Sequence, residues 1–221
     1  MNPFYQQQRK KFDAILKSYL STESLIEGLY LRAILDSYLR VKIIPNINTY
    51  TENKIRDEFI RDFKNTNALV KDYIQNKIIV LTAENQAYTK SLTQRTDIEL
   101  ISSWHSHRFV VECKRLSFAE GRYIHGKMVK GKHEIDGMEK FIHLIYAEGD
   151  KEAAMLSFVI KSDPQKTTNK LRDKVEVFRP APDMGKFIGK KCIGLATSFQ
   201  SNHTRTDGSP IQIYHVFLDF R

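Results

Sequence analysis

The segment Phe109-Val110-Val111-Glu112-Cys113-Lys114 restricts the fold of this chain more than any other. Its three consecutive apolar residues predict a strand buried on both faces, as central strands of a sheet are. Side chains two positions apart point the same way, so Glu112 and Lys114 share one face of that strand. Burying charged groups without partners is costly, so the segment also predicts nearby groups that compensate them.

A second carboxylate lies within reach of this strand. Asp97 begins the run 97–101, which also predicts a strand, and fourteen residues separate it from Glu112. A hairpin through residues 102–107 would place Asp97 beside Glu112. Two carboxylates and an ammonium group that converge on one point suit a hard divalent cation with an activated water.

The pair Thr96-Asp97 followed by Glu112-Cys113-Lys114 resembles the signature of the PD-(D/E)XK nuclease superfamily, with Thr96 where the signature has proline. The resemblance implies catalytic roles for Asp97, Glu112 and Lys114. It also implies a Mg²⁺ or Mn²⁺ ion held by Asp97, Glu112 and the main-chain carbonyl of Cys113. A lysine beside the metal is expected to have a lowered pKa. The alternative is an edge strand on which Glu112 and Lys114 form an ordinary polar pair.

The predicted elements indicate an α/β (α+β) fold. Helical periodicity covers residues 51–65 with Thr51 as the cap, three strands follow at 77–82, 97–101 and 109–114, and a helix at 134–146 precedes a strand at 153–161. Helix, three strands, helix, strand is the core order of the restriction-endonuclease-like fold, a mixed sheet flanked by helices. The resemblance therefore covers about residues 50–162.

Two further resemblances concern the helices of this core. A helix before the first strand often lends a glutamate to the site in the superfamily, and Glu52, on the inward face with Ile55 and Phe59, matches that place. The alternative is a first-turn glutamate favoured by the helix dipole. The run 137–141 followed by Tyr146 also resembles bacterial members, in packing more than in chemistry.

The remaining chain divides into two flanking regions. Residues 1–48 predict an N-terminal helical extension of two helices, 49–162 form the nuclease-like core, and 163–221 contain a basic, flexible segment and a C-terminal β-hairpin packed on the core. Asp207-Gly208 is a turn signal for this hairpin. Along its second strand Ile211, Ile213 and His215 share one face, and His203 is expected to meet His215 as a polar pair.

The charge balance favours a partner with a phosphate backbone. Thirty-five Lys and Arg residues against 26 Asp and Glu residues give a formal charge of +9. We expect phosphate contacts from the basic residues that follow the site lysine, Arg115, Arg122, Lys127, Lys130 and Lys132. A solvated loop is an equal alternative for this segment.

Several other classes of function are disfavoured. No apolar run is long enough to span a membrane, and Cys113 and Cys192 lack metal-ligand spacing, so we expect reduced, buried thiols in a cytoplasmic protein. His105 and His107 would bind zinc only with further ligands, which cannot be assigned. Gly-rich phosphate loops, dinucleotide fingerprints and Ser-His-Asp constellations are absent from the sequence.

These observations predict a Mg²⁺-dependent endonuclease that acts on nucleic acid, with DNA as the favoured substrate. Stand-alone bacterial nucleases that resemble this chain often belong to restriction or phage-defence systems, where a homodimer or a partner protein is compatible with such a role. The main alternative is a catalytically silent nucleic-acid-binding or assembly module that retains the nuclease fold. A helix-mediated scaffold in which the motif is coincidental is a third reading.

Overall fold

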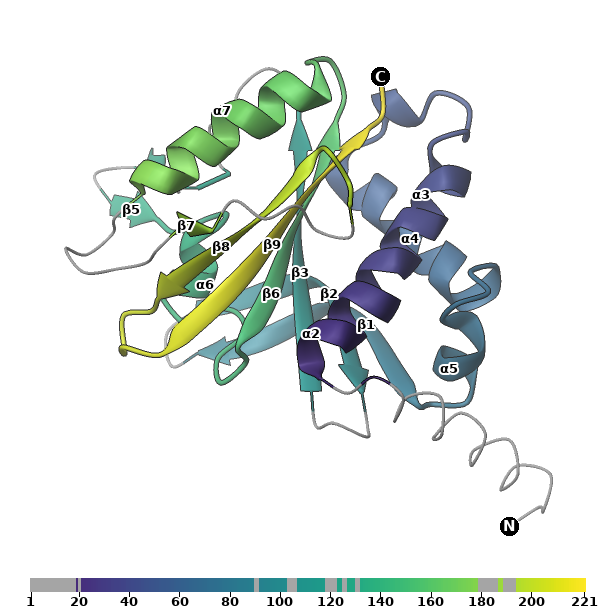
Figure 1. Cartoon of the computed structure of the whole chain (residues 1–221), viewed down its shortest axis with the longest axis horizontal. Helices are drawn as coiled ribbons and strands as arrows, with labels where there is room; N and C mark the ends of the chain where they lie inside the picture. Colours follow the sequence, from purple (N-terminus) through teal and green to yellow (C-terminus); the bar gives the residue numbers. More distant parts are fainter. Residues whose placement is uncertain are drawn as a thin grey trace, which may run out of the picture.

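The computed structural model of the chain describes residues 19, 21–89, 92–102, 107–117, 123–124, 127–129, 132–178, 187–188 and 194–221. A mixed sheet lies between helices on both of its faces (Figure 1). The predicted α+β class is therefore confirmed. None of the described helices is both long and apolar enough to cross a membrane.

The described chain begins with helical elements, continues with five consecutive strands, and then has α6, β6 and α7 before three final strands. The helical elements are α2 (Thr22–Leu25), the π-helical η1 (Ile26–Leu31), α3 (Arg32–Val41), the 3₁₀ turn η2 (Ile47–Thr49), α4 (Glu52–Asn65), α5 (Lys71–Gln75), α6 (Glu139–Ile142) and α7 (Pro164–Val177). The strands are β1 (Ile79–Thr89), β2 (Leu92–Ser102), β3 (His107–Leu116), β4 (Lys127–Val129), β5 (Lys132–Glu134), β6 (Glu152–Val159), β7 (Phe187–Ile188), β8 (Ser198–Thr204) and β9 (Pro210–Asp219).

Seven strands form the main sheet in the order β1-β2-β3-β6-β9-β8-β7. Strands β1, β2 and β3 are antiparallel neighbours, and the predicted hairpin joins β2 to β3 with Ile98 opposite Val111. Strand β6 runs parallel to both β3 and β9. The strand that carries Glu112 and Lys114 therefore has neighbours on both sides, as its apolar run predicts.

Each face of the sheet has its own hydrophobic core. Phe109, Val111 and Cys113 of β3 pack on the face covered by α3 and α4. Val110 and Leu116 pack on the opposite face, where Leu171 and Val175 of α7 lie. Glu112 and Lys114 have the parity of Val110 and Leu116, so both emerge on the α7 side of the sheet.

The predictions for the helices near the start of the core are confirmed. Helix α4 begins where expected, and the Thr51 hydroxyl accepts a hydrogen bond from the N–H of Lys54 at 3.3 Å. The second helix of the N-terminal extension corresponds to α2, η1 and α3, which follow one another without a break. The first predicted helix falls almost entirely outside the described residues.

The region after residue 162 contradicts one prediction. The basic segment is not a flexible linker but contains helix α7, whose cap Asp163 accepts the N–H of Lys166 at 2.8 Å. Pro164 occupies the first helical position, where its missing N–H costs nothing. The many lysines of this segment face solvent, while Leu171 and Val175 bury the opposite side.

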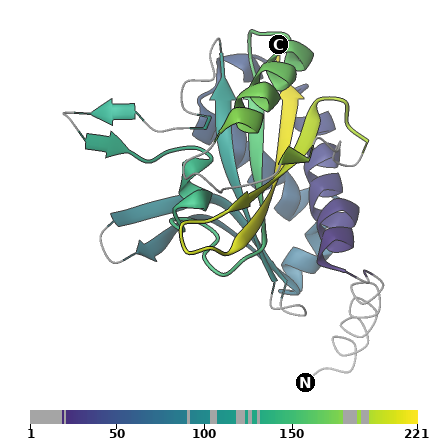
Figure 2. The same ribbon diagram turned by 60° about the vertical axis from the view of Figure 1, so that its left-hand side comes forward.

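The predicted helix at 134–146 is also much shorter than expected. Only Glu139–Ile142 are helical, and Glu134 belongs to β5. Gly137 and Leu144 have φ angles of 58° and 59°, which a right-handed helix excludes at both ends of α6. Upstream, β4 and β5 pair as a small hairpin that projects from the body of the protein (Figure 2).

The C-terminal strands β8 and β9 form the predicted antiparallel hairpin and extend the sheet. Arg205, in the turn region between them, is 3% exposed and binds the loop after α6. Its Nη2 atom donates to the carbonyl oxygens of Ala147 at 2.7 Å and Asp150 at 2.6 Å. These hydrogen bonds fasten the hairpin to the centre of the fold.

A buried polar chain runs through this hairpin. His215 lies 2.6 Å from the Tyr123 hydroxyl through Nδ1 and 2.7 Å from the Ser201 hydroxyl through Nε2. Nε2 of His203 lies 2.7 Å from the same Ser201 hydroxyl. The two histidines therefore meet through a bridging serine and not directly. Burial, with a smaller effect of His203, lowers the pKa of His215 well below 6.5.

Acid should destabilise the protein through His215. The folded chain keeps the imidazole neutral, whereas the unfolded chain takes up a proton as the pH falls through about 6.5, so the free energy of unfolding decreases below that pH by up to about 1.4 kcal/mol per unit. His215→Gln should lose this part of the slope between pH 7.5 and 5.5. Urea unfolding of both proteins measures it, with the half-buried His143→Gln as control. Equal slopes for wild type and His215→Gln would contradict the assignment.

Candidate active site

The hairpin between β2 and β3 brings the two predicted carboxylates to one face. Ile98 and Val111 are register partners, and both pack in the core beside α3 and α4. Their neighbours Asp97 and Glu112 therefore lie on the other face. The side chain of Glu112 is only 1% exposed and that of Asp97 is 15% exposed. Two carboxylates are thus held next to each other in a largely buried place.

Two lysines form ion pairs with the Oε1 atom of Glu112. Nζ of Lys114 lies 2.8 Å from Glu112 Oε1, and Nζ of Lys140, from α6, lies 2.8 Å from the same atom. Asp136 binds both lysines, with its Oδ1 atom 3.0 Å from Nζ of Lys114 and 3.3 Å from Nζ of Lys140. Two ammonium groups and two carboxylates therefore form a closed ring of ion pairs.

The second oxygen of Glu112 is different. Oε2 is buried and has no hydrogen-bond partner in the described part of the chain. A carboxylate oxygen taken out of water without a partner is costly. One side of Glu112 is therefore satisfied twice, and the other side is available for a cation.

Asp97 lies where the β2–β3 ladder ends. Its Oδ2 atom accepts the main-chain N–H of Cys113 at 2.7 Å, and Oδ1 lies 3.2 Å from Nη1 of Arg56 on α4. Burial raises the pKa of Asp97 to about 7, and the charge of Glu112 adds to the effect. Arg56 also forms an ion pair with Asp57, 2.9 Å away.

Glu52 reaches the same strand from the first turn of α4. Its Oε2 atom accepts the main-chain N–H of Arg115 at 2.6 Å, directly after Lys114. Burial raises the pKa of Glu52, whereas Lys114 and the Arg115 N–H act in the opposite direction. The structure thus brings together all four residues predicted to be catalytic, Glu52, Asp97, Glu112 and Lys114. Their catalytic roles stay predictions.

Among the protein groups of the cluster alone, the pKa of Lys114 is raised, and the lowered pKa expected beside a metal ion stays a prediction. Burial alone would lower it, but the surrounding carboxylates of Glu112, Glu52 and Asp136 outweigh burial and raise the pKa of Lys114 above its ordinary value. Lys114 is therefore a fixed positive charge. It can orient a water and offset negative charge, but it is not suited to act as a general base that accepts a proton.

Three residues of this cluster escaped sequence analysis. No motif contains Arg56, Asp136 or Lys140. The apolar periodicity of residues 134–146 predicts only a helix. The signal that could have identified Lys140 is the run 137–141 followed by Tyr146, whose resemblance to bacterial members concerns packing more than chemistry. In the structure Lys140 Nζ lies 3.2 Å from the Tyr146 hydroxyl and 4.7 Å from the centre of its ring, so this run also reaches Glu112.

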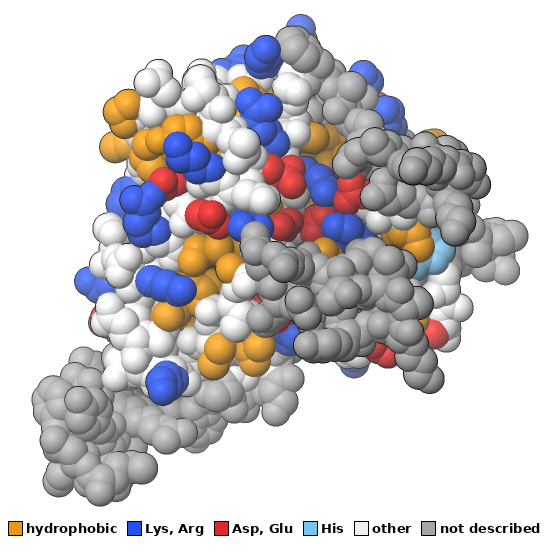
Figure 3. All heavy atoms as spheres, turned by 180° about the vertical axis from the view of Figure 1, so that it is seen from behind, with side chains coloured by type: hydrophobic (Ala, Val, Ile, Leu, Met, Phe, Trp, Pro, Cys, Tyr) orange, Lys and Arg blue, Asp and Glu red, His pale blue; other side chains and the backbone are white. Residues whose placement is uncertain are grey.

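The predicted phosphate-binding residues are only partly placed by the structure. Arg115 is half-buried and its Nη2 atom donates to the carbonyl oxygen of Asn48 at 3.1 Å. Lys127 and Lys132 lie in the β4–β5 hairpin, while Arg122 and Lys130 fall outside the described residues. Across the face opposite to that of Figure 1, Lys and Arg side chains are spread among acidic ones and do not form one patch (Figure 3).

The donors at the cluster suit a hard cation, but the set is small. Carboxylate and carbonyl oxygens are the ligands that Mg²⁺ and Mn²⁺ prefer. The N–H and C=O of one residue point to the same side of a strand, so the Cys113 carbonyl faces the side on which Asp97 lies. Among the described residues, no group of three or more His, Cys, Asp or Glu side chains could hold a metal ion. Asp97, Glu112 and one carbonyl are therefore the minimal candidate set.

The other histidine and cysteine predictions add no ligand. His107 begins β3 and its Nε2 atom lies 3.5 Å from Glu152, while its proposed partner His105 falls outside the described residues. Cys113 is a free, buried thiol, as expected, on the face opposite to Glu112. Cys192 is not among the residues that the structure describes.

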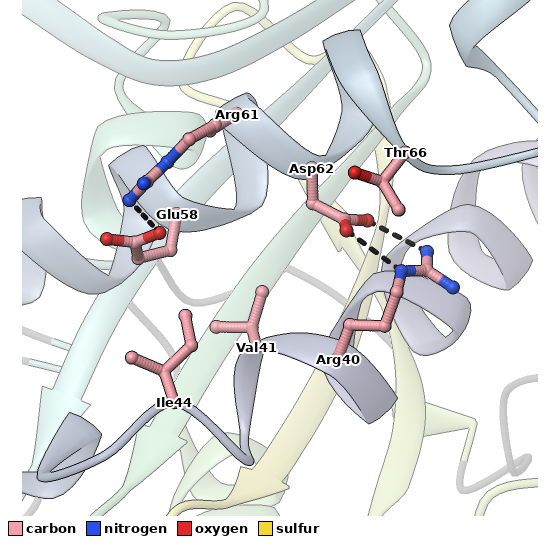
Figure 4. Close-up of a pocket in the computed structure, with 7 residues that line it drawn as sticks. All are labelled: Arg40, Val41, Ile44, Glu58, Arg61, Asp62 and Thr66. Carbon is pink, nitrogen blue, oxygen red and sulfur yellow. Dashed lines mark hydrogen bonds and ion pairs between the residues drawn. The ribbon is translucent and has the colours of Figure 1, made fainter.

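A second candidate site is a pocket between α3 and α4 (Figure 4). Two arginines line it, but both are paired within the protein. Arg40 lies 2.8 Å from Asp62, and Arg61 forms an ion pair with Glu58. No free guanidinium of this pocket is left for an anion, so the β3 cluster is the stronger candidate.

Comparison of the chain with protein-family models, with curated proteins and with solved structures finds no match. The candidate site therefore has to be judged from its own geometry and charges.

Asp97→Asn should stabilise the protein at high pH. A folded-state pKa near 7, raised from 3.8, means that the carboxyl favours folding while it is protonated and loses this contribution as the pH rises from about 4 to 7. At pH 8 the variant should be more stable by on the order of 2 kcal/mol, below the full shift because the group is partly exposed. Near pH 4 the two proteins should be equal.

Urea unfolding at pH 4.5, 6 and 8 measures this difference. Asp173→Asn, which removes an exposed carboxyl outside the cluster, is the matched control and should show no such dependence. An Asp97→Asn variant that is no more stable than wild type at pH 8 would show that the carboxylate is well compensated as it stands.

Proposed function

We propose that the chain is a metal-dependent nuclease that hydrolyses phosphodiester bonds. The observation that carries the proposal is Glu112, a carboxylate buried in a central strand with one oxygen that has no partner among the described residues, beside Asp97 with its raised pKa. Buried ionisable groups with shifted pKa values cluster at functional sites. The order α4, β1, β2, β3, α6, β6, with α5 inserted after α4 and the β4–β5 hairpin inserted before α6, supports the further proposal that residues 49–162 form a restriction-endonuclease-like core.

Each residue of the cluster has a role in this proposal. Asp97, Glu112 and the Cys113 carbonyl would hold Mg²⁺ or Mn²⁺, which when bound polarises water and phosphate oxygens. Lys114 orients the attacking water and offsets charge that develops on the phosphate. Glu52 supports the site through the main chain of Arg115, because its carboxylate fixes the strand directly after Lys114.

Nucleic acid is the proposed substrate, with DNA favoured. The formal charge of +9 provides non-specific attraction to a phosphate backbone. The projecting β4–β5 hairpin carries Lys127 and Lys132 and follows the site strand in sequence. A place in a restriction or phage-defence system, as a homodimer or with a partner protein, is an analogy at the level of the fold.

A catalytically silent nucleic-acid-binding or assembly module is the second candidate. The observation that favours it is that Lys114, Lys140 and Arg56 form ion pairs with the carboxylates, so the acidic groups have cationic partners within the chain itself. A module of this kind would bind nucleic acid with the salt dependence of phosphate contacts but would neither bind divalent cations at Glu112 nor cleave.

Divalent cations should switch on cleavage. Purified protein given mixed DNA and RNA should be inert with a chelator and active on at least one substrate with Mg²⁺ or Mn²⁺. Asp97→Asn, Glu112→Gln and Lys114→Ala should each lower the rate by at least about 100-fold, since each removes a charge that acts on the reacting phosphate. Lys114→Ala should leave binding nearly unchanged, because one lysine adds little to a phosphate footprint.

Glu148→Gln, an exposed carboxylate outside the cluster, is the matched control and should cleave like wild type. Calorimetric titration with Mn²⁺ separates an inactive enzyme that awaits a partner from a silent module. Wild type that binds neither Mn²⁺ nor Mg²⁺, with or without nucleic acid, while all variants melt normally, would refute the nuclease proposal.

The lysines at positions 127, 130 and 132 should govern affinity and not chemistry. Replacing Lys127, Lys130 and Lys132 by glutamate should weaken nucleic-acid binding and flatten its salt dependence by about 0.9 in log–log slope for each phosphate that the variant no longer neutralises. Fluorescence anisotropy across a salt titration measures the slope. Unchanged binding by the triple variant would remove this segment from the interface.

A further inference from the structure

Lys140 is the residue of the cluster whose position needs the most explanation. It comes from the four-residue helix α6, yet its Nζ atom lies 2.8 Å from Oε1 of Glu112. Lys114 already lies 2.8 Å from the same oxygen. Oε1 of Glu112 therefore has two ammonium partners, whereas Oε2 has none among the described residues.

The surroundings hold Lys140 in this position. The Tyr146 hydroxyl lies 3.2 Å from its Nζ atom, and the ring centre lies 4.7 Å away, within the range of a cation–π contact. Its side chain is only 14% exposed. Lys140 therefore is not a surface lysine that happens to touch the site.

Asp136 offers Lys140 a second anchor. Its Oδ1 atom lies 3.3 Å from Nζ of Lys140, farther than Glu112 Oε1, and 3.0 Å from Nζ of Lys114. The N–H of Gly137 donates to the same oxygen at 2.8 Å and fixes its place. A small movement of Lys140 toward Asp136 would release Glu112 and keep the ammonium group paired.

The charges of the cluster explain why such a movement matters. Four carboxylates, Glu52, Asp97, Glu112 and Asp136, meet three cations, Lys114, Lys140 and Arg56, so the formal sum is −1. A divalent cation at Glu112 would meet the ammonium group of Lys140 at short range in a poorly hydrated place, where repulsion between like charges is strong. Its affinity would therefore depend on where Lys140 is held.

We infer that Lys140 is a positioning residue that occupies Glu112 in the metal-free protein and limits the affinity of the site for divalent cations, with Asp136 as its alternative anchor. This inference rests on the proposed function, because it concerns the same metal ligand. It adds a regulated affinity that neither the carboxylates nor Lys114 provides.

Opposite effects of two substitutions test the inference. Lys140→Met removes the competing charge and should bind Mn²⁺ at least about tenfold more tightly than wild type, the change that corresponds to about 1.4 kcal/mol. Asp136→Asn removes the alternative anchor and should bind Mn²⁺ about tenfold more weakly. A merely structural role would weaken binding in both variants. Lys140→Arg should stay close to wild type.

The measurement is titration of full-length protein with Mn²⁺ alone, read by loss of the free-ion signal in electron paramagnetic resonance. Lys151→Met, which removes an exposed lysine outside the cluster, is the matched control and should equal wild type. Thermal melting of each variant verifies that it is folded. If Lys140→Met does not fold, the Asp136→Asn variant decides, and unchanged or tighter binding overturns the inference.

The outcomes separate the inference from the proposed function. Wild type that binds Mn²⁺ while Lys140→Met binds it equally or more weakly overturns the inference alone. Wild type that does not bind while Lys140→Met does supports the inference, because the lysine then blocks the site. Absence of binding in wild type, Lys140→Met and Lys140→Arg overturns both.

Discussion

A charged carboxylate in the middle of a buried strand is the constraint on which this structure depends. Glu112 is 1% exposed, between β2 and β6, and its desolvation has to be offset by groups that converge from several elements. Lys114 comes from the same strand, Lys140 from α6, and Asp136 from the turn before it. The short helix and its flanking turns are therefore arranged around this one residue as much as around the core.

The same constraint explains the opposite end of the cluster. Strand β2 is paired with β3 up to Ile98 and Val111, and Asp97 then binds the Cys113 N–H through its side chain instead of continuing the ladder. Glu52 does the same for the Arg115 N–H from α4. Two side-chain carboxylates thus substitute for a neighbouring strand, so the β2–β3 ladder ends at the point where the acidic groups gather.

Periodic sequence patterns predicted the part of the fold that lies closest to the site. The β2–β3 hairpin, the cap and inward face of α4, and the C-terminal hairpin of β8 and β9 follow from alternation, capping and turn residues, which are local signals. The sequence of helix α7 predicts a flexible segment because its many charged residues outnumber its two buried aliphatic residues, Leu171 and Val175. No local pattern predicts Lys140 and Asp136, since Lys140 contacts Glu112 and Asp136 contacts Lys114 across more than twenty residues of chain.

The distribution of charge within the cluster favours a binding role over a purely structural one. Buried ion pairs contribute little stability compared with apolar packing, so a network kept only for the fold would be expected to satisfy all of its oxygens. Here Oε1 of Glu112 has two ammonium partners and Oε2 has none within the described chain, while Asp97 keeps a raised pKa beside it. Moving one lysine would have relieved this imbalance. Its persistence is understandable if the unpartnered side is reserved for a cation that the folded protein binds in use.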